Sequence, residues 1–153
     1  MGMIEDGAAV TLFIAFGLAS QVCLVMFFAA RRWAPGLADR FGWLAYAVAM
    51  LGLPLSAWLF ASDETEGLWV GPVLLAAWGV LGTVVDLWRR VEWRTPIRWR
   101  VFVPYVALYF WAQMFLWWPL WDVERGAWLC FLGLFTVNTA LNLRGHARDA
   151  RLR

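Results

Sequence analysis

The chain has 153 residues, of which 63% are hydrophobic, and its formal net charge is +2. Soluble domains are roughly 45–50% apolar, so a soluble core of this size could not hide so much apolar surface. The length allows a single domain, and the charge is too small to indicate nucleic-acid binding. The composition therefore argues against a soluble fold and favours an integral membrane protein.

Five segments are predicted to span a membrane, because a helix needs roughly 20 mainly apolar residues to cross the hydrocarbon layer. In chain order they are residues 8–30, 42–61, 68–88, 101–121 and 127–143. The first follows an acidic N-terminus rather than a basic one, so we expect a span and not a removable signal peptide. The apolar runs are continuous, which favours helices over a barrel. The sequence thus predicts an all-α integral membrane protein, with residues 1–153 forming one bundle of five transmembrane helices.

The charged residues between these segments predict the orientation of the bundle. Twelve of the thirteen arginines fall in one set of connections and in the C-terminal tail: Arg31, Arg32, Arg40, Arg89, Arg90, Arg94, Arg98, Arg100, Arg144, Arg148, Arg151 and Arg153. The opposite set is acidic and contains only one arginine: Glu5, Asp6, Asp63, Glu64, Glu66, Asp122, Glu124 and Arg125. Short basic loops stay in the cytoplasm, so the N-terminus is expected outside and the C-terminus in the cytoplasm.

The thirteen tryptophans are expected to serve mainly as interfacial anchors, because most of them stand at predicted span boundaries. Trp78 and Trp111 lie deeper and are predicted either to pack between helices or to line a pocket. The two cysteines, Cys23 and Cys130, have no partner at metal-ligand or redox-motif spacing. The single histidine, His146, stands in the tail, so neither a metal nor a cofactor is expected.

Polar residues within the spans are the candidates for function, because such residues are costly in hydrocarbon and usually face the bundle interior. Tyr105, Tyr109 and Gln113 are spaced by four and share one face of the fourth span. Asn138 on the fifth span and Gln21 on the first belong to the same half of the membrane. These residues either form interhelical hydrogen bonds, each contributing about 0.6 kcal/mol, or converge on a ligand pocket. The predicted ligand-binding set is Gln21, Trp78, Tyr105, Tyr109, Trp111, Gln113 and Asn138.

Asp86, near the cytoplasmic end of the third span, has two alternative roles. It stands three and four residues before Arg89 and Arg90, so it can form a local ion pair on one helix face. If it turns inward instead, it becomes the candidate acid of a membrane enzyme. In the same span, Gly79 and Gly82 give a flat face for packing, either within the chain or against a partner.

Prolines shape two of the predicted spans. Pro54 interrupts the second span and is expected to kink it, whereas Pro104 lies in the first turn of the fourth, where proline is tolerated.

A short segment resembles the tryptophan-rich sensory protein (translocator) family, whose members are small, Trp-rich and five-span. Residues 33–36 read Trp-Ala-Pro-Gly where that family carries Trp-x-Pro-Pro, and Phe41 and Gly42 lead into the second span. The second proline of the motif is Gly36 here, and the family's Leu-Tyr…Gln-Leu…Leu-Asn…Trp pattern is absent from residues 68–88. The resemblance implies binding of porphyrins or other apolar ligands.

Three functions are compatible with these features. The first is a non-catalytic accessory or scaffold subunit of a membrane complex, in contact with other membrane subunits or a second copy. The second is binding or transport of an apolar or amphipathic molecule, such as a lipid, an isoprenoid or a tetrapyrrole. The third is an intramembrane isomerase or cyclase that uses Asp86. In each case we expect a multi-pass protein of the bacterial inner (plasma) membrane, surrounded by the lipid bilayer and without a nucleic-acid partner.

Overall fold

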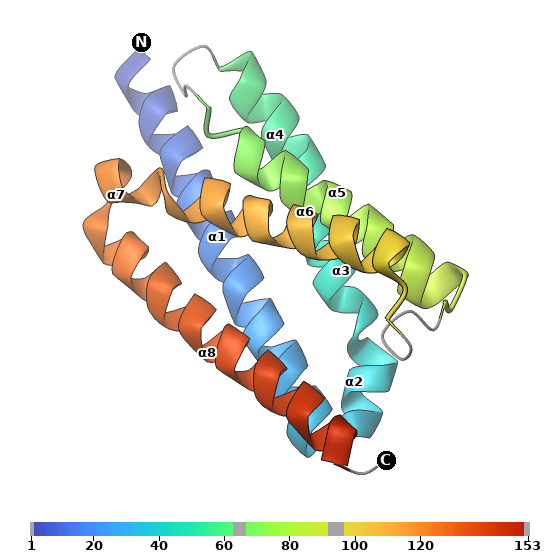
Figure 1. The fold of residues 1–153 in the computed structure, drawn as a ribbon. Helices are drawn as coiled ribbons and strands as arrows, with labels where there is room; N and C mark the ends of the chain where they lie inside the picture. Colours follow the sequence, from blue (N-terminus) through green and yellow to red (C-terminus); the bar gives the residue numbers. More distant parts are fainter. Residues whose placement is uncertain (1, 63–66, 92–96, 152–153) are drawn as a thin grey trace.

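The computed structural model describes residues 2–62, 67–91 and 97–151, with side chains described for 7–62, 67–91 and 97–142 (Figure 1). Its regular elements are α-helices and one short π-helix, labelled η1. They are α1 (Gly2–Trp33), α2 (Pro35–Phe41), α3 (Trp43–Met50), α4 (Gly52–Ala61), α5 (Val70–Gly82), η1 (Thr83–Trp88), α6 (Trp99–Trp117), α7 (Leu120–Val123) and α8 (Arg125–Arg151).

Four helical segments are long and apolar enough to cross a membrane: Gly7–Trp33, Trp43–Ala61, Val70–Trp88 and Trp99–Val123. They coincide with the first four predicted spans and indicate a membrane protein. The fifth predicted span, 127–143, is helical within α8 but is not among the four. Asn138 and Asn142 lower the mean hydropathy of residues 127–142, the part of this span whose side chains are described.

Several residues used to predict the orientation lie outside the described side chains, so the orientation stays a prediction. They are Glu5, Asp6, Asp63, Glu64, Glu66, Arg94, and Arg144, Arg148, Arg151 and Arg153 of the tail; His146 of the tail lies outside the described side chains as well.

The helices form two groups that meet along the bundle axis. α5 packs against α3, α4 and α6, whereas α8 packs along α1 and runs in the same direction (Figure 1). The start of α1, the end of α4 and the short α7 lie toward one end of the bundle, called here the α7 end. The end of α1, the helix α2 and the end of α8 lie at the opposite end, called the α2 end.

The second predicted span is divided into α3 and α4, as Pro54 leads us to expect. Proline has no N–H to bond the carbonyl four residues earlier, so the helix loses a hydrogen bond at that turn. The break falls at Leu51, whose N–H instead contacts the carbonyl of Val48 at 3.2 Å. The next residue, Gly52, lies so close to the carbonyl of Pro72 that a Cβ there would collide with it. The kink therefore brings α4 directly onto the start of α5.

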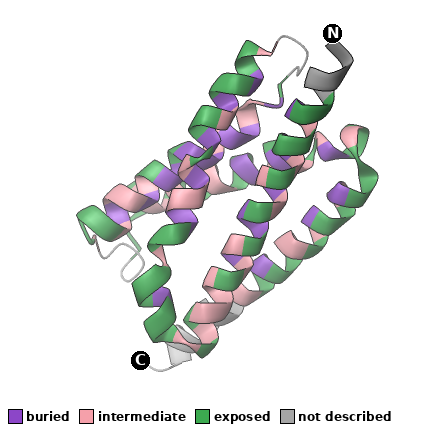
Figure 2. Ribbon diagram, turned by 180° about the vertical axis from the view of Figure 1, so that it is seen from behind, coloured by how far each residue is buried: buried purple, intermediate pink, exposed green. Residues whose placement is uncertain are grey.

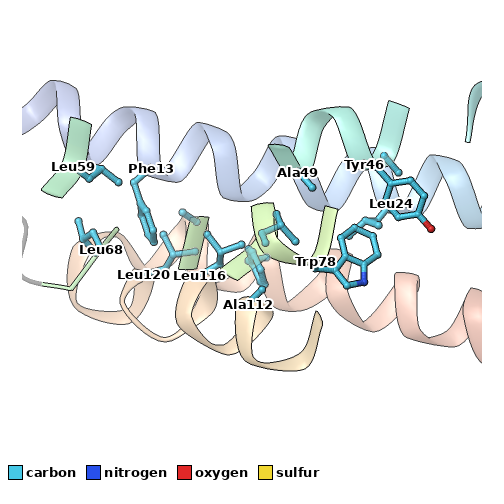
Figure 3. Close-up of a cluster of buried hydrophobic side chains, with 14 of the residues drawn as sticks. Phe13, Leu24, Tyr46, Ala49, Leu59, Leu68, Trp78, Ala112, Leu116 and Leu120 are labelled. Carbon is cyan, nitrogen blue, oxygen red and sulfur yellow. The ribbon is translucent and has the colours of Figure 1, made fainter. Parts of the chain in front are cut away.

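The bundle is filled unevenly along its length (Figure 2). Toward the α7 end, apolar side chains from most helices interlock, and Phe13, Leu59, Leu116 and Phe131 are at most 1% exposed. Figure 3 shows part of this row continuing toward the α2 end as far as Trp78 and Tyr46. In α6, by contrast, the buried side chains begin only at Ala112, and no residue from 99 to 111 is buried.

Candidate functional site

Four polar side chains from three helices meet in the interior. Gln21 of α1 donates from Nε2 to Oε1 of Gln113 on α6. Asn138 of α8 donates from Nδ2 to the hydroxyl of Tyr109 at 2.7 Å, with a longer contact of 3.5 Å to Oε1 of Gln21. Gln21 and Gln113 are 0% exposed and Asn138 is 1% exposed. We call these four residues the amide cluster.

The amide cluster follows from helix geometry. Tyr109 and Gln113 are four residues apart, so their side chains stand one above the other on the same face of α6. That face meets α1 and α8, each of which contributes one amide. A buried amide without hydrogen bonds would cost several kcal/mol in hydrocarbon, so polar groups on different helices find one another.

A second polar group contains Asp86, and it includes a residue that the sequence did not single out. The hydroxyl of Tyr46, on α3, donates to Oδ2 of Asp86 at 2.5 Å. It also lies 3.0 Å from the hydroxyl of Tyr105 on α6. Asp86 is half-buried, and its carboxylate faces the hydroxyl group of Tyr46; its two predicted roles stay predictions. We call Tyr46, Asp86 and Tyr105 the phenol–carboxylate group.

Asp86 lies within η1, where the helix changes from α to π geometry. The N–H of Arg89 donates to the carbonyl of Val84 at 2.8 Å, five residues earlier, and this wider turn defines the π-helix. The segment ends at Trp88, and Arg90, two residues later, has a left-handed φ of +45°. π-Helical turns within α-helices occur frequently at functional sites, so η1 makes the cytoplasmic end predicted for the third span a candidate site.

Gly82 allows Tyr46 to reach Asp86. A Cβ at Gly82 would collide with the ring of Tyr46, and a Cβ at Gly79 would lie 2.9 Å from Cβ of Ala49. The flat face predicted at Gly79 and Gly82 is therefore used for packing within the chain, against α3. Tyr46 could have been suspected from the sequence only as one of three tyrosines in the predicted spans, since nothing in its spacing relates it to Asp86.

Trp78 joins the two polar groups. Its ring is 4% exposed, and its centroid lies 5.2 Å from that of Tyr46, 5.5 Å from that of Tyr105 and 5.4 Å from that of Tyr109. These are all three tyrosines of the chain. Tilted rings at such distances attract one another through their quadrupoles. The tryptophan thus separates the phenol–carboxylate group from the amide cluster while touching both.

Trp111 does not belong to the site. Its side chain is 54% exposed and packs beside Phe110 and Phe115 on the outer surface of α6. The prediction that it could line the pocket is corrected by helix geometry. Residues two apart are turned by about 200° around a helix of 3.6 residues per turn, so Trp111 faces away from Tyr109 and Gln113.

Among the described residues, four buried polar atoms have no hydrogen-bond partner. One, Nε1 of Trp117, lies four residues after Gln113 toward the α7 end, and the other three lie at the site. They are Nε2 of Gln113, Nε1 of Trp78 and Oδ1 of Asn138. An unsatisfied buried donor or acceptor costs about 1–3 kcal/mol, and most buried polar atoms in proteins therefore have a partner. Two N–H donors and one carbonyl acceptor at the site are therefore unsatisfied within the described part of the chain.

No group of three or more His, Cys, Asp or Glu side chains that could hold a metal ion is found within the described ranges. Cys23 is half-buried on α1 and Cys130 is exposed on α8, and both are free thiols. The chemistry available at the site is therefore that of amides, phenols, an indole and one carboxylate.

Comparisons of this chain with protein-family models, with curated proteins and with solved structures gave no match. The short resemblance at residues 33–42 is accordingly not extended by any relative, and the function has to be inferred from the residues of the chain itself.

Proposed function

We propose that the chain is a five-span protein of the bacterial inner membrane, with the α7 end outside and the α2 end in the cytoplasm. The described arginines at the α2 end include Arg31, Arg32 and Arg40, and they are exposed or half-buried. Exposed tryptophans, among them Trp33 and Trp118 at 68% and 73%, support the expected interfacial anchoring. With 27 residues, α8 reaches about 40 Å at 1.5 Å per residue, which suffices for a fifth crossing.

Reporter fusions test this topology. Alkaline phosphatase fused after residue 124 should be active, because that connection is predicted outside, and a fluorescent protein fused after residue 153 should fluoresce in the cytoplasm. An active phosphatase at the C-terminus would contradict the fifth span.

We infer further that the protein binds an apolar or amphipathic small molecule, such as a lipid, an isoprenoid or a tetrapyrrole, in the cytoplasmic half of the bundle. The observation that carries this inference is the set of buried polar atoms without partners on Gln113, Trp78 and Asn138. Ligand sites are mainly apolar with a few convergent polar groups, and this site has that composition.

The packing around the site supports entry from the lipid. Tyr105 and Tyr109 on α6 are only half-buried, as are Leu141 and Asn142 on α8. The ring of Phe28, on α1, also packs against the core while remaining partly exposed. A molecule in the inner leaflet therefore has partly exposed side chains to pass before it meets the fully buried amides.

Retention of a co-purified molecule is the test of binding. The wild-type protein, extracted in mild detergent, should carry a small molecule detectable by mass spectrometry after organic extraction. Gln113→Leu and Asn138→Leu should each reduce its amount while the helical circular-dichroism signal stays unchanged. Thr136→Val is the matched control, because Thr136 is exposed and bonds only the carbonyl of Leu132 within its own helix. Equal retention in all four proteins would refute binding at the amide cluster.

Association with other subunits is the second candidate, favoured by one feature of α8. A Cβ at Gly133 would meet no atom within 4 Å, and Leu129 and Val137 beside it are 62% and 48% exposed. This face can contact a partner subunit or a second copy as well as lipid. Mass measurement in mild detergent tests the idea: a monodisperse monomer without a co-purifying protein would contradict it.

The remaining hypothesis, an intramembrane isomerase or cyclase, would use Asp86 as its acid. In support of it, the hydroxyl groups of Tyr46 and Tyr105 lie beside that carboxylate. Turnover that survives in Asp86→Asn would exclude this mechanism.

A further inference from the structure

We propose that the molecule bound at the amide cluster has an apolar chain and an uncharged hydroxyl head, as in a long-chain or isoprenoid alcohol. This proposal rests on the binding function proposed above and narrows its ligand class. It follows from the number and kind of buried groups that have no partner, from the absence of formal charge in the cluster, and from the apolar surroundings.

The hydrogen-bond inventory matches a hydroxyl group. Nε2 of Gln113 and Nε1 of Trp78 are donors, and Oδ1 of Asn138 is an acceptor, and none of them has a partner among the described residues. A hydroxyl has one O–H donor and two acceptor lone pairs. One hydroxyl can therefore accept from both N–H groups and donate to the amide carbonyl. A ketone offers no donor for Asn138, and an ammonium offers no acceptor for the two N–H groups.

The lack of formal charge in the amide cluster also argues against a ligand with an ionised head group. The amide cluster consists of neutral side chains, and Gln21, Gln113 and Asn138 are at most 1% exposed. Moving a carboxylate or an ammonium into such surroundings costs several kcal/mol unless it is paired. The nearest carboxylate found in the described site, that of Asp86, already accepts from Tyr46 and belongs to the group on the other side of Trp78. An uncharged head avoids this desolvation cost.

The surroundings require an apolar chain. Phe28 on α1 and Leu108 on α6 pack against the core while part of their apolar surface stays exposed. A small polar molecule would leave this surface without a partner, whereas a hydrocarbon chain would cover it on its way to the lipid. A buried water satisfies the same hydrogen bonds without such a chain, and the experiment has to separate the two.

Four probes with closely similar fifteen-carbon chains make the test: farnesol, farnesylamine, farnesoic acid and the hydrocarbon farnesene. Each is titrated into the purified, detergent-solubilised protein, and the bound fraction is measured by native mass spectrometry. We expect farnesol to bind at least tenfold more tightly than each of the other three. Gln113→Leu and Asn138→Leu should remove this preference, whereas Thr136→Val should keep it.

Trp78→Phe provides a second variant that keeps an aromatic ring against the three tyrosines and removes the indole N–H together with its five-membered ring, and farnesene binding controls for the lost ring. It should weaken farnesol binding several-fold and leave the weak binding of farnesene unchanged, even if an amide variant fails to fold. Unchanged farnesol affinity in Trp78→Phe would overturn the assignment of Nε1 as a donor to the head.

The outcomes distinguish the hydroxyl head group proposed here from the binding of any small molecule proposed above. Equal or tighter binding of the amine or the acid, or equal binding of all four probes, overturns the hydroxyl head. If the protein also retains a co-purified molecule with a charged head, ligand binding still stands. If no probe binds and no molecule is retained, both proposals fail, and buried water is the partner of the three atoms.

Discussion

The two ends of the bundle share α1, α5, α6 and α8 but are filled in different ways. At the α7 end, Phe13, Leu116 and Phe131 are at most 1% exposed, and side chains from α1, α6 and α8 close the interior. Toward the α2 end, α6 buries no side chain before Ala112. Close packing of apolar side chains thus holds the helices together at one end, while polar groups and partly exposed rings occupy the other. With the binding function proposed above, stability and binding would depend on separate halves of the bundle.

The largest effect is expected from the apolar end. Phe131→Ala removes a ring that contacts Gly17 of α1, where a Cβ would lie 3.7 Å from it. The cavity should lower the free energy of unfolding by about 3 kcal/mol, the lower range for buried phenylalanine. Unfolding in mixed micelles of increasing denaturing detergent measures this change. If the two halves are separate as proposed, retention of the bound molecule should not change in the folded fraction.

Gly82→Ala is the next largest change and acts at the α2 end. The added methyl group would collide with the ring of Tyr46, so that either the ring or the helix must shift, at a cost of about 1–3 kcal/mol. The bond from Tyr46 to Asp86 should be lost with it. Gly133→Ala is the matched control, because nothing lies within 4 Å of its Cβ position. If both variants unfold at the same detergent concentration, α3 does not pack on Gly82 as described.

A smaller effect is expected within the amide cluster. Gln21→Leu leaves Oε1 of Gln113 without its donor, which should cost about 1 kcal/mol. The double variant Gln21→Leu/Gln113→Leu should recover part of that loss, because both partners are then apolar. The same unfolding titration on the two single variants and the double variant gives the coupling energy. Strict additivity would show that the two amides do not interact.

The smallest effect on stability is expected for an exposed tryptophan, Trp111, compared with the buried Trp78. Trp111→Leu should change the free energy of unfolding by no more than about 0.5 kcal/mol, since its side chain is 54% exposed on the outer face of α6. Binding should be unaffected. Trp78→Leu, at a ring that contacts all three tyrosines, should reduce both stability and binding. A loss of binding in Trp111→Leu would return that residue to the site.

The amino-acid sequence by itself determined the features that depend on local periodicity and composition. Continuous apolar runs predicted five spans, four of which match helices long and apolar enough to cross a membrane, and Pro54 predicted the break between α3 and α4. The spacing of four also predicted that Tyr109 and Gln113 share a face. These predictions hold because each needs only the geometry of one helix, which is the same in every protein.

Only the tertiary structure decided which helix faces meet. Gln21 contacts Gln113 across 92 residues, and Tyr46 contacts Asp86 across 40. The π-helical turn around Asp86 was likewise absent from the sequence pattern. Periodicity fixes which residues share a face, but the rotation of each helix about its axis is set by contacts such as that of Tyr46 with Gly82. Such contacts join segments far apart in the chain, so the site exists only once the helices have packed.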